Sequence, residues 1–282
     1  MEKQRDFKVF SGFVLKIIAL VSMTFDHVGY FLADYENYRE IANIFRIIGR
    51  LAFPLFIFLL VEGIIHTKNI KNYLMRLGIL ELVFLVGQIF NFLLINKGQA
   101  MISPMIDLLL TAVCIYLLNR KDKFSYFAII PVAWAFLSLF VRNYETIHLQ
   151  KISWFPFFLR LDYGILGPLL GIGFYYANDL AKAFLKSNEN TKNFIDTTYE
   201  RTTKNIISAI VLILLTVLLC FIDENAKYAL YSISWEFYSI LAFIPILLYS
   251  GKRGYNSKWF QYGCYFYFPA HLIIIFLIFA LI

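Results

Sequence analysis

The chain has 282 residues, of which 60% are hydrophobic and 16% charged, and its formal net charge is +7. Soluble domains are about 45–50% apolar and about 25% charged. The composition therefore excludes a soluble enzyme, a disordered chain and, despite the positive charge, a nucleic-acid-binding protein. The three cysteines lie in apolar runs, which excludes a disulfide-stabilised secreted domain. We therefore expect an all-α, polytopic integral membrane protein.

A helix that crosses the bilayer needs about 20 apolar residues, and the chain contains about nine such segments. The predicted helices cover residues 12–33, 44–66, 72–95, 101–118, 124–141, 159–181, 205–222, 228–249 and 259–281. A tenth, half-length helix is expected if Ile152–Leu159 is helical. No stretch between these segments has the composition of a domain linker, so the sequence predicts one membrane domain over residues 1–282.

The first apolar segment follows basic residues, as a signal peptide does, but it is long and has no A-x-A cleavage pattern. We therefore expect it to remain in the protein as the first helix. Lys and Arg residues concentrate in every second loop, and the cytosolic loops of membrane proteins are the ones enriched in these residues. This alternation predicts a cytosolic N-terminus and a C-terminus on the outer side.

Ionisable residues inside a bilayer are costly, so each of them is a candidate functional residue. A rise of about 1.5 Å per helical residue places the candidates in two layers. The outer-to-middle layer contains His27, Arg50, Asp162, Glu236 and His271, and the inner layer contains Lys16, Glu62, His66 and Arg76. So many polar groups predict a polar cavity across much of the membrane.

The first predicted helix carries Lys16 and His27 eleven residues apart. This spacing is almost three full turns, so the two side chains share a helix face about 16 Å apart along the axis. Asp26 points about 100° away from His27, so no Asp26–His27 dyad is expected. The alternatives are that Lys16 extends to lipid phosphates and that His27 bonds to a neighbouring helix.

In the second predicted helix, Arg46 and Arg50 lie one turn apart on one face. Pro54 has no amide hydrogen to donate to the Arg50 carbonyl, so a kink is expected there. Glu62 and His66 are also one turn apart, and a structural ion pair is the alternative to a functional role.

The later segments contribute fewer candidates. Pro269 precedes His271 in the last predicted helix, and Glu236 lies in the eighth. Asp162 is expected at the start of the sixth helix, where a carboxylate also serves a purely structural role beside the helix N-terminus. Asp107 lies in the fourth helix without an evident partner.

The chain contains no Walker loop, G-x-G-x-x-G, HExxH or G-x-S-x-G motif. The His and carboxylate residues are too scattered in sequence to predict a metal site. A histidine in a dry cavity suits general-base catalysis, because its unperturbed pKa lies near neutrality. The inner basic layer suits an anionic cofactor from the cytosol. Together these features favour transfer of a group from a cytosolic carrier to an acceptor in or beyond the membrane.

Two long segments resemble the N-terminal half of the TraX family, whose best-known member acetylates the pilin N-terminus in conjugation systems. They read LKIIALVSMTFDHVGYF and RIIGRLAFPLFIFLLVEGIIHTKNIKNYLMRL. Two later segments, DYGILGPLLGIGFYYA and YFYFPAHL, resemble later motifs of that family. The spacing of Lys16 and His27 is also similar to a signature of the wider acyltransferase-3 superfamily, which has Arg at the first position and includes the lysosomal heparan-glucosamine acetyltransferase.

The resemblance implies an N-acetyltransferase of the bacterial cytoplasmic membrane that uses acetyl-CoA. We expect the donor to be bound by residues of the inner layer, Lys16, Arg76, Glu62 and His66. The catalytic candidates are His27 as general base, Arg50 as the group that orients the acceptor or stabilises the oxyanion, and His271. The candidates for the acceptor pocket are Arg46, Asp162 and Glu236. The acceptor is a pilin or other peptide N-terminus or an amino sugar, and a route through acetyl-His27 stays open.

Two other classes of function remain. A transporter or flippase would use the buried charges as a substrate or proton path, but it is expected to show inverted repeats, and no matching halves are visible. A non-catalytic assembly factor for pili or other surface structures would need none of the buried ionisable residues individually.

Overall fold

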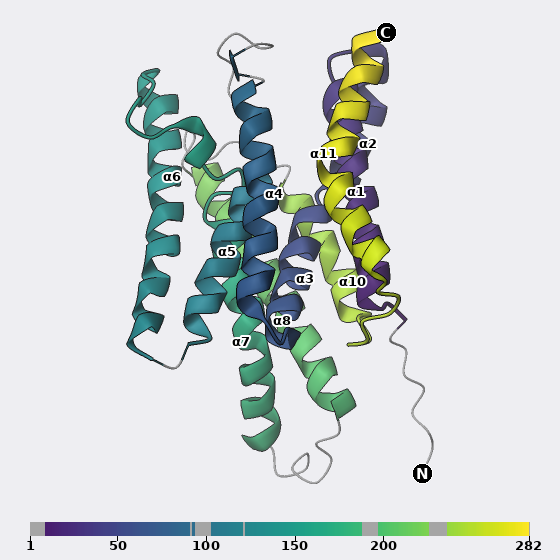
Figure 1. The fold of residues 1–282 in the computed structure, drawn as a ribbon, viewed down its shortest axis with the longest axis vertical. Coiled ribbons are helices and arrows are strands. Elements are labelled where there is room, and N and C mark those ends of the chain that lie inside the picture. Colours follow the sequence, from purple (N-terminus) through teal and green to yellow (C-terminus); the bar gives the residue numbers. More distant parts are fainter. Residues whose placement is uncertain are drawn as a thin grey trace. The chain divides into compact units, whose positions relative to one another are not determined.

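The computed structural model describes residues 9–90, 92–93, 103–120, 122–187, 197–225 and 236–281, and the regular elements within them are helices (Figure 1). Six of these helices are long and apolar enough to cross a membrane. They span Gly12–Leu32, Glu36–His66, Ile70–Phe90, Lys123–Glu145, Tyr199–Cys220 and Lys258–Leu281. Two further apolar helices, Pro104–Leu118 and Phe237–Leu247, are shorter. The chain is therefore an all-helical, multi-pass membrane protein, as predicted.

The chain divides into two compact units. The first unit comprises Met1–Leu59, Tyr176–Thr216 and Ser234–Ile282, and the second comprises Leu60–Tyr175 and Val217–Ile233. Three helices, α3 (Ala52–His66), α7 (Leu166–Ser187) and α8 (Thr197–Asn225), contribute residues to both units.

The first unit is built on a helical hairpin of α1 (Gly12–Leu32) and α2 (Arg39–Gly49), joined through the short 3-10 helix η1 (Glu36–Tyr38). Ser11 begins α1, because its hydroxyl accepts a hydrogen bond from the Val14 amide. The two helices approach closely at glycines: a methyl group on Gly29 would meet the Ala42 carbonyl oxygen at 2.9 Å. Glycine is therefore required where the two helices cross.

The predicted kink before Pro54 is present as a break between α2 and α3 at Arg50 and Leu51. The amide of Arg50 still donates to the Arg46 carbonyl, and the next helix begins at Ala52. Pro54 explains the break, because it cannot donate to the carbonyl four residues before it.

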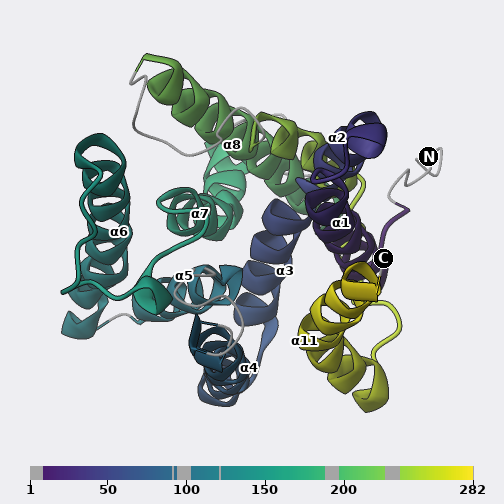
Figure 2. The same cartoon turned by 90° about the horizontal axis from the view of Figure 1, so that it is seen from above.

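The last helix of the first unit, α11 (Lys258–Leu281), lies beside α1 (Figure 2). Phe260, Tyr267, His271 and Phe279 of α11 contact Lys16, Thr24, His27 and Phe31 of α1, respectively. Residue numbers increase in the same direction along these contacts in both helices, so α1 and α11 run parallel (Figure 1). The unit also contains η6 (Phe237–Ala242) and α10 (Phe243–Leu247), and the chain at Tyr249 forms an isolated bridge with Phe10.

The second unit contains α4 (Ile70–Phe90), α5 (Pro104–Leu118), η3 (Lys123–Ala128), α6 (Ile129–His148) and the short η4 (Phe157–Leu159). A buried apolar cluster of Ile106, Ala135, Leu161 and Ile165 joins α5 and α6 to the chain before α7. Helix α6 ends where Leu149 adopts a left-handed conformation with φ of 53°. The chain from there to α7 is irregular and is held by side chains of α5 and α6.

This irregular stretch corrects two predictions. Ile152–Leu159 is not a half-helix: only Phe157–Leu159 forms a short 3-10 helix, and Pro156 before it is extended. The helix predicted at 159–181 begins at Leu166, so Asp162 is not in its first turn. Side-chain hydrogen bonds explain both differences. Ser138 accepts the Leu161 amide at 2.8 Å, and the Trp134 ring nitrogen donates to the Leu159 carbonyl at 2.9 Å.

The remaining predicted helices agree with the structure within a few residues, except where α8 extends to Thr197–Asn225 and α6 to His148. The first part of the helix predicted at 228–249 lies outside the described residues, as do residues 91, 94 and 95 of the third predicted helix and 101 and 102 of the fourth.

Candidate functional site

The first unit contains a network of charged side chains around the buried Arg50, where α1, the α2–α3 break and η6 meet. Arg50 donates through one terminal nitrogen to Asp26 and through the other to Glu236. Arg46 donates to the second Asp26 oxygen at 2.9 Å. Only 8% of the Arg50 side chain is exposed, against 13% for Asp26 and 16% for Glu236. Two arginines and two carboxylates sum to no net charge, so the network compensates its members in a medium that opposes isolated charges.

Local geometry explains how the network forms. The spacing of Arg46 and Arg50 puts both guanidinium groups on one face of α2, as predicted. Gly49 lies between them, and a methyl group there would overlap the Asp26 side chain. Glycine at this position therefore lets the carboxylate lie between the two arginines.

Asp26 had no assigned role in the sequence analysis, which considered it only as a partner of His27. The structure confirms that Asp26 points elsewhere, because it bonds Arg46 and Arg50. The depth predicted for Arg50, level with His27, was the signal that could have identified this pair. The predicted Arg50 and Glu236 belong to one network, although the sequence did not connect them.

Beside the network on α1, His27 meets His271 of α11. The His27 Nδ1 and His271 Nε2 atoms are 3.1 Å apart, and the ring centroids are 5.0 Å apart. His271 is buried, and the Tyr267 ring stacks on it with a centroid distance of 5.1 Å. The Tyr267 hydroxyl in turn bonds the Thr24 hydroxyl. The last helix thus supplies a histidine and a tyrosine to the face of α1 that carries His27.

Hydrogen bonds to the main chain assign the protons of the two neutral rings. The Nδ1 atom of His27 is 2.9 Å from the Met23 carbonyl, and that of His271 is 2.8 Å from the Tyr267 carbonyl. A carbonyl accepts only, so each Nδ1 carries its hydrogen and each Nε2 carries a lone pair. The His271 lone pair faces His27. The His27 Nε2 atom has no hydrogen-bond partner among the described residues, so its lone pair is not used within this part of the chain.

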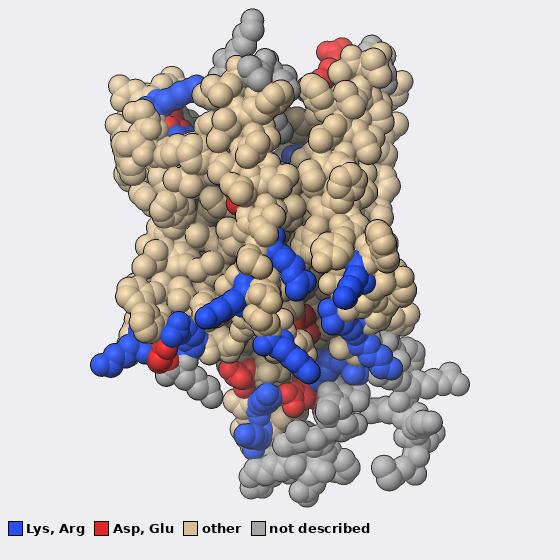
Figure 3. All heavy atoms as spheres, viewed as in Figure 1, with Lys and Arg blue, Asp and Glu red and all other residues tan. Residues whose placement is uncertain are grey.

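Lys16 lies near the other end of α1 and, like His27, faces α11. Its amino group is 5.8 Å from the centroid of the Phe260 ring. The amides of Gly12 and Phe13 donate to the carbonyls of Lys252 and Arg253, at 2.8 Å and 3.0 Å. These contacts bring Lys252 and Arg253, both exposed, to the start of α1. In Figure 3, Lys and Arg atoms gather at the end of the first unit where α11 begins.

The other predicted residues belong to the second unit. Glu62 is buried at the end of α3, and the His66 Nδ1 atom lies 2.9 Å from the Glu62 main-chain carbonyl. Arg76 is exposed on α4. The amide of Asp162 donates to Asp107, and Arg142 donates to the Asp162 carbonyl at 3.2 Å. The role of these residues in donor or acceptor binding stays a prediction.

Asp107, which had no partner in the sequence analysis, has two in the structure. Its carboxylate accepts the amides of Asp162 and Tyr163 at 2.9 Å and 3.1 Å. Asp107 is fully buried. It therefore satisfies the main chain that leads into α7.

Comparison with known proteins finds a matching protein family and a similar curated protein. A model of the TraX protein family matches residues 11–187, more than half of the chain. A probable fimbrial assembly protein FimC, serogroup H1, from Dichelobacter nodosus is 41% identical over 68 residues. That match covers 24% of this chain and 27% of the FimC protein, so this chain spans only about a quarter of the length of that relative. No solved structure matches the chain.

Proposed function

The chain belongs to the TraX family, and from this membership together with the paired histidines we propose that it is a membrane-embedded N-acetyltransferase. It moves an acetyl group from cytosolic acetyl-CoA to an amine at or beyond the outer face of the bacterial cytoplasmic membrane. The observation that carries the proposal is the His27 Nε2 lone pair, which main-chain and histidine contacts orient beside a buried charge network.

We propose nine membrane-spanning helices with a cytosolic N-terminus. The two shorter apolar helices and α7, added to the six long apolar helices, make this number. The parallel course of α1 and α11 supports it, because parallel first and last helices require an odd number of crossings in total. A cysteine introduced at Glu36 should then be labelled from outside. A cysteine at residues 188–191, which lie outside the described residues, should be labelled only after permeabilisation.

The donor binds at the cytosolic end of α1. Lys16, Lys252 and Arg253 supply positive charge there for the phosphates of CoA. The thioester then has to reach His27 over about 16 Å, the rise of eleven helical residues. The assignment of Arg76, Glu62 and His66 of the second unit to the donor rests on their predicted depth alone.

The transfer step uses His27 as general base. Its Nε2 atom takes a proton from the acceptor amine as the nitrogen attacks the acetyl carbonyl, and the CoA thiolate leaves. His271 orients His27, because its Nε2 atom accepts a hydrogen bond from the His27 Nδ1 atom. Both terminal nitrogens of Arg50 already donate to carboxylates, so we assign Arg50 to positioning through Asp26 and Glu236 rather than to contact with the oxyanion. A route through acetyl-His27 is distinguished by labelled acetyl on the protein when no acceptor is present.

Binding of CoA is the first test. Thermal unfolding of the purified protein should shift upward with millimolar CoA, because a ligand that binds only the folded state stabilises it. Lys16→Ala and Arg76→Ala should each reduce the shift. Lys151→Ala, which changes an exposed lysine in the chain after α6, should leave it unchanged. If CoA does not raise the unfolding temperature of the wild-type protein, the proposal that acetyl-CoA is the donor is wrong.

The reaction itself is tested in cells. Mass spectrometry of surface proteins and glycans should show acetyl groups that disappear when the gene is deleted and return with the wild-type gene. An unchanged acetyl pattern contradicts the proposal.

A non-catalytic role in pilus assembly is the second candidate, and the similarity to a probable fimbrial assembly protein favours it. This role predicts that the deletion strain has pilus defects and that a gene encoding the His27→Ala variant restores the pili fully. The proposed acetyltransferase activity predicts that the same variant restores no acetylation in that strain.

A further inference from the structure

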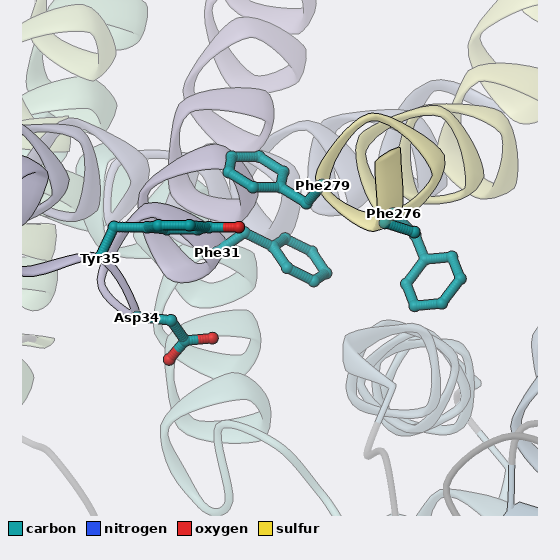
Figure 4. Close-up of a pocket in the computed structure, with 6 residues that line it drawn as sticks. Phe31, Asp34, Tyr35, Phe276 and Phe279 are labelled. Atoms are coloured by element: carbon teal, nitrogen blue, oxygen red, sulfur yellow. The ribbon is translucent and has the colours of Figure 1, made fainter. Parts of the chain in front are cut away.

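A cleft lies where α1 and α11 end together, on the face that carries the histidine pair (Figure 4). Its volume is about 160 Å³. The lining residues are Phe31, Asp34, Tyr35, Phe276, Phe279 and Ala280. Asp34 and Tyr35 follow the end of α1, while the last three belong to α11. Figure 4 shows the Asp34 carboxylate and the aromatic rings of both segments around the same space.

The rings form an ordered wall. Phe31 and Phe279 stack with a centroid distance of 5.3 Å and an interplanar angle of 16°. The Tyr35 ring lies 6.2 Å from that of Phe279. Aromatic faces carry partial negative charge and attract cations that lie over them. Phe31 and Phe279 each cover one face of the other, so the wall offers a cation the uncovered faces of these rings and of Tyr35.

Asp34 adds a full negative charge to this wall. Its residue is exposed, and no cation forms an ion pair with it among the described residues. The nearby Arg46 points instead to Asp26 and lies over the Tyr30 ring at 5.7 Å. A carboxylate that accepts hydrogen bonds, beside aromatic faces that attract a cation, is the combination that recognises an ammonium group.

The cleft lies directly beyond the histidine pair. The same two helices bring His27 to His271 and, one turn further along α1, Phe31 to Phe279. Asp34 follows His27 by seven residues, a helical rise of about 10 Å, so an amine held at Asp34 has to advance about that far to reach His27.

We propose that this cleft is the acceptor subsite of the proposed acetyltransferase, on which the inference rests, and that it captures the ammonium form of a peptide-type amine. The apolar wall with one carboxylate suits a charged amine joined to an apolar residue. It offers few partners for the hydroxyls of an amino sugar. The amine is held as an ammonium group at Asp34 and releases one proton to water. The neutral amine then advances to His27, whose Nε2 atom takes a second proton as the nitrogen attacks the acetyl carbonyl.

Direct binding tests the cleft without any reaction. Phenethylammonium and its neutral counterpart 2-phenylethanol are titrated calorimetrically into the full chain in lipid nanodiscs. The cation should bind saturably and more tightly than the alcohol. Asp34→Asn and Phe279→Leu should each weaken the cation by about threefold to fivefold, as expected for exposed carboxylate and ring contacts.

Two matched variants control for general effects. Glu36→Gln removes an exposed carboxylate two residues from Asp34 that does not line the cleft. Phe266→Leu replaces the aromatic ring of Phe266, a residue of α11 that is 74% exposed, with an aliphatic side chain. Both should bind phenethylammonium like the wild type. Equal affinities in all four variants, or no preference for the cation, overturn the inference.

Acetyl transfer supplies a second readout. Asp34→Asn should raise the KM for a cationic peptide amine about threefold while kcat and the KM for acetyl-CoA stay unchanged, because the charge acts in capture only. An unchanged acceptor KM in an active enzyme overturns the inference. If the wild type transfers no acetyl group but the cation binds in an Asp34-dependent manner, the proposed function fails and the cation site stands.

Discussion

The two units of the molecule use carboxylates of low solvent exposure in different ways. In the first unit, Asp26 bonds two arginine side chains from another part of the chain, and one of these also bonds Glu236. In the second unit, Asp107 bonds two main-chain amides of the irregular segment before α7. The Asp107 contacts are explained by the need to satisfy buried amides. The first network joins ionised side chains beside a histidine pair, so it is the stronger candidate for function.

Among changes in the first unit, substitution of His27 should cause the largest loss of acetyl-transfer activity. His27→Ala removes the proposed base, so the rate of acetyl transfer should fall by about 10²–10⁴. His27→Gln keeps a polar group without the basicity and should fail similarly. Both are measured by release of CoA from acetyl-CoA with a peptide amine. Wild-type rates in folded variants would refute the base, and His271 would be the next candidate.

Removal of Arg50 should have the largest effect on stability. Arg50→Ala leaves Asp26 and Glu236 without their shared cation, which costs about 3–5 kcal/mol when a buried ion pair loses one partner. Thermal unfolding in detergent measures the loss. Arg120→Ala, whose partner Asp122 is exposed, is the matched control and should change little. Equal unfolding of Arg50→Ala and wild type would show that the network does not stabilise the first unit.

Asp107 should separate stability from activity. Asp107→Ala leaves the amides of Asp162 and Tyr163 without an acceptor and should cost about 1–3 kcal/mol. Because this carboxylate is structural, the folded fraction should still transfer acetyl groups at the wild-type rate. Chemical unfolding and the rate per folded molecule are measured on the same sample. A loss of activity beyond the loss of folded protein would place Asp107 in the site.

The exposed pair of Arg120 and Asp122 should have the smallest effect. Hydrogen bonds from Arg120 lower the pKa of the Asp122 carboxyl. A lowered pKa means that this pair contributes at neutral pH and that its contribution is lost as acid protonates Asp122. Because both side chains are exposed, Asp122→Asn should leave the unfolding temperature at pH 7 unchanged. A clear decrease would show that surface pairs matter here as much as buried ones.

The helices themselves follow from the sequence. The segments predicted at 12–33 and 259–281 are α1 and α11 almost to the residue, because a run of about 20 apolar residues is required to cross a bilayer. The break before Pro54 follows equally from local chemistry, since proline lacks the amide hydrogen. Periodicity also put Lys16 and His27 on one face, and both contact α11.

Contacts between distant segments depended on the tertiary structure. No local pattern brings His271 to His27 or Glu236 to Arg50, since 244 and 186 residues separate them in sequence. Asp26 was passed over because its own helix offers it no partner. The irregular chain before α7 was predicted as helix because its residues are apolar, whereas Ser138, Trp134 and Asp107 supply its hydrogen bonds from other helices. Apolar runs determine where helices cross the membrane, and packing alone determines which polar groups meet between them.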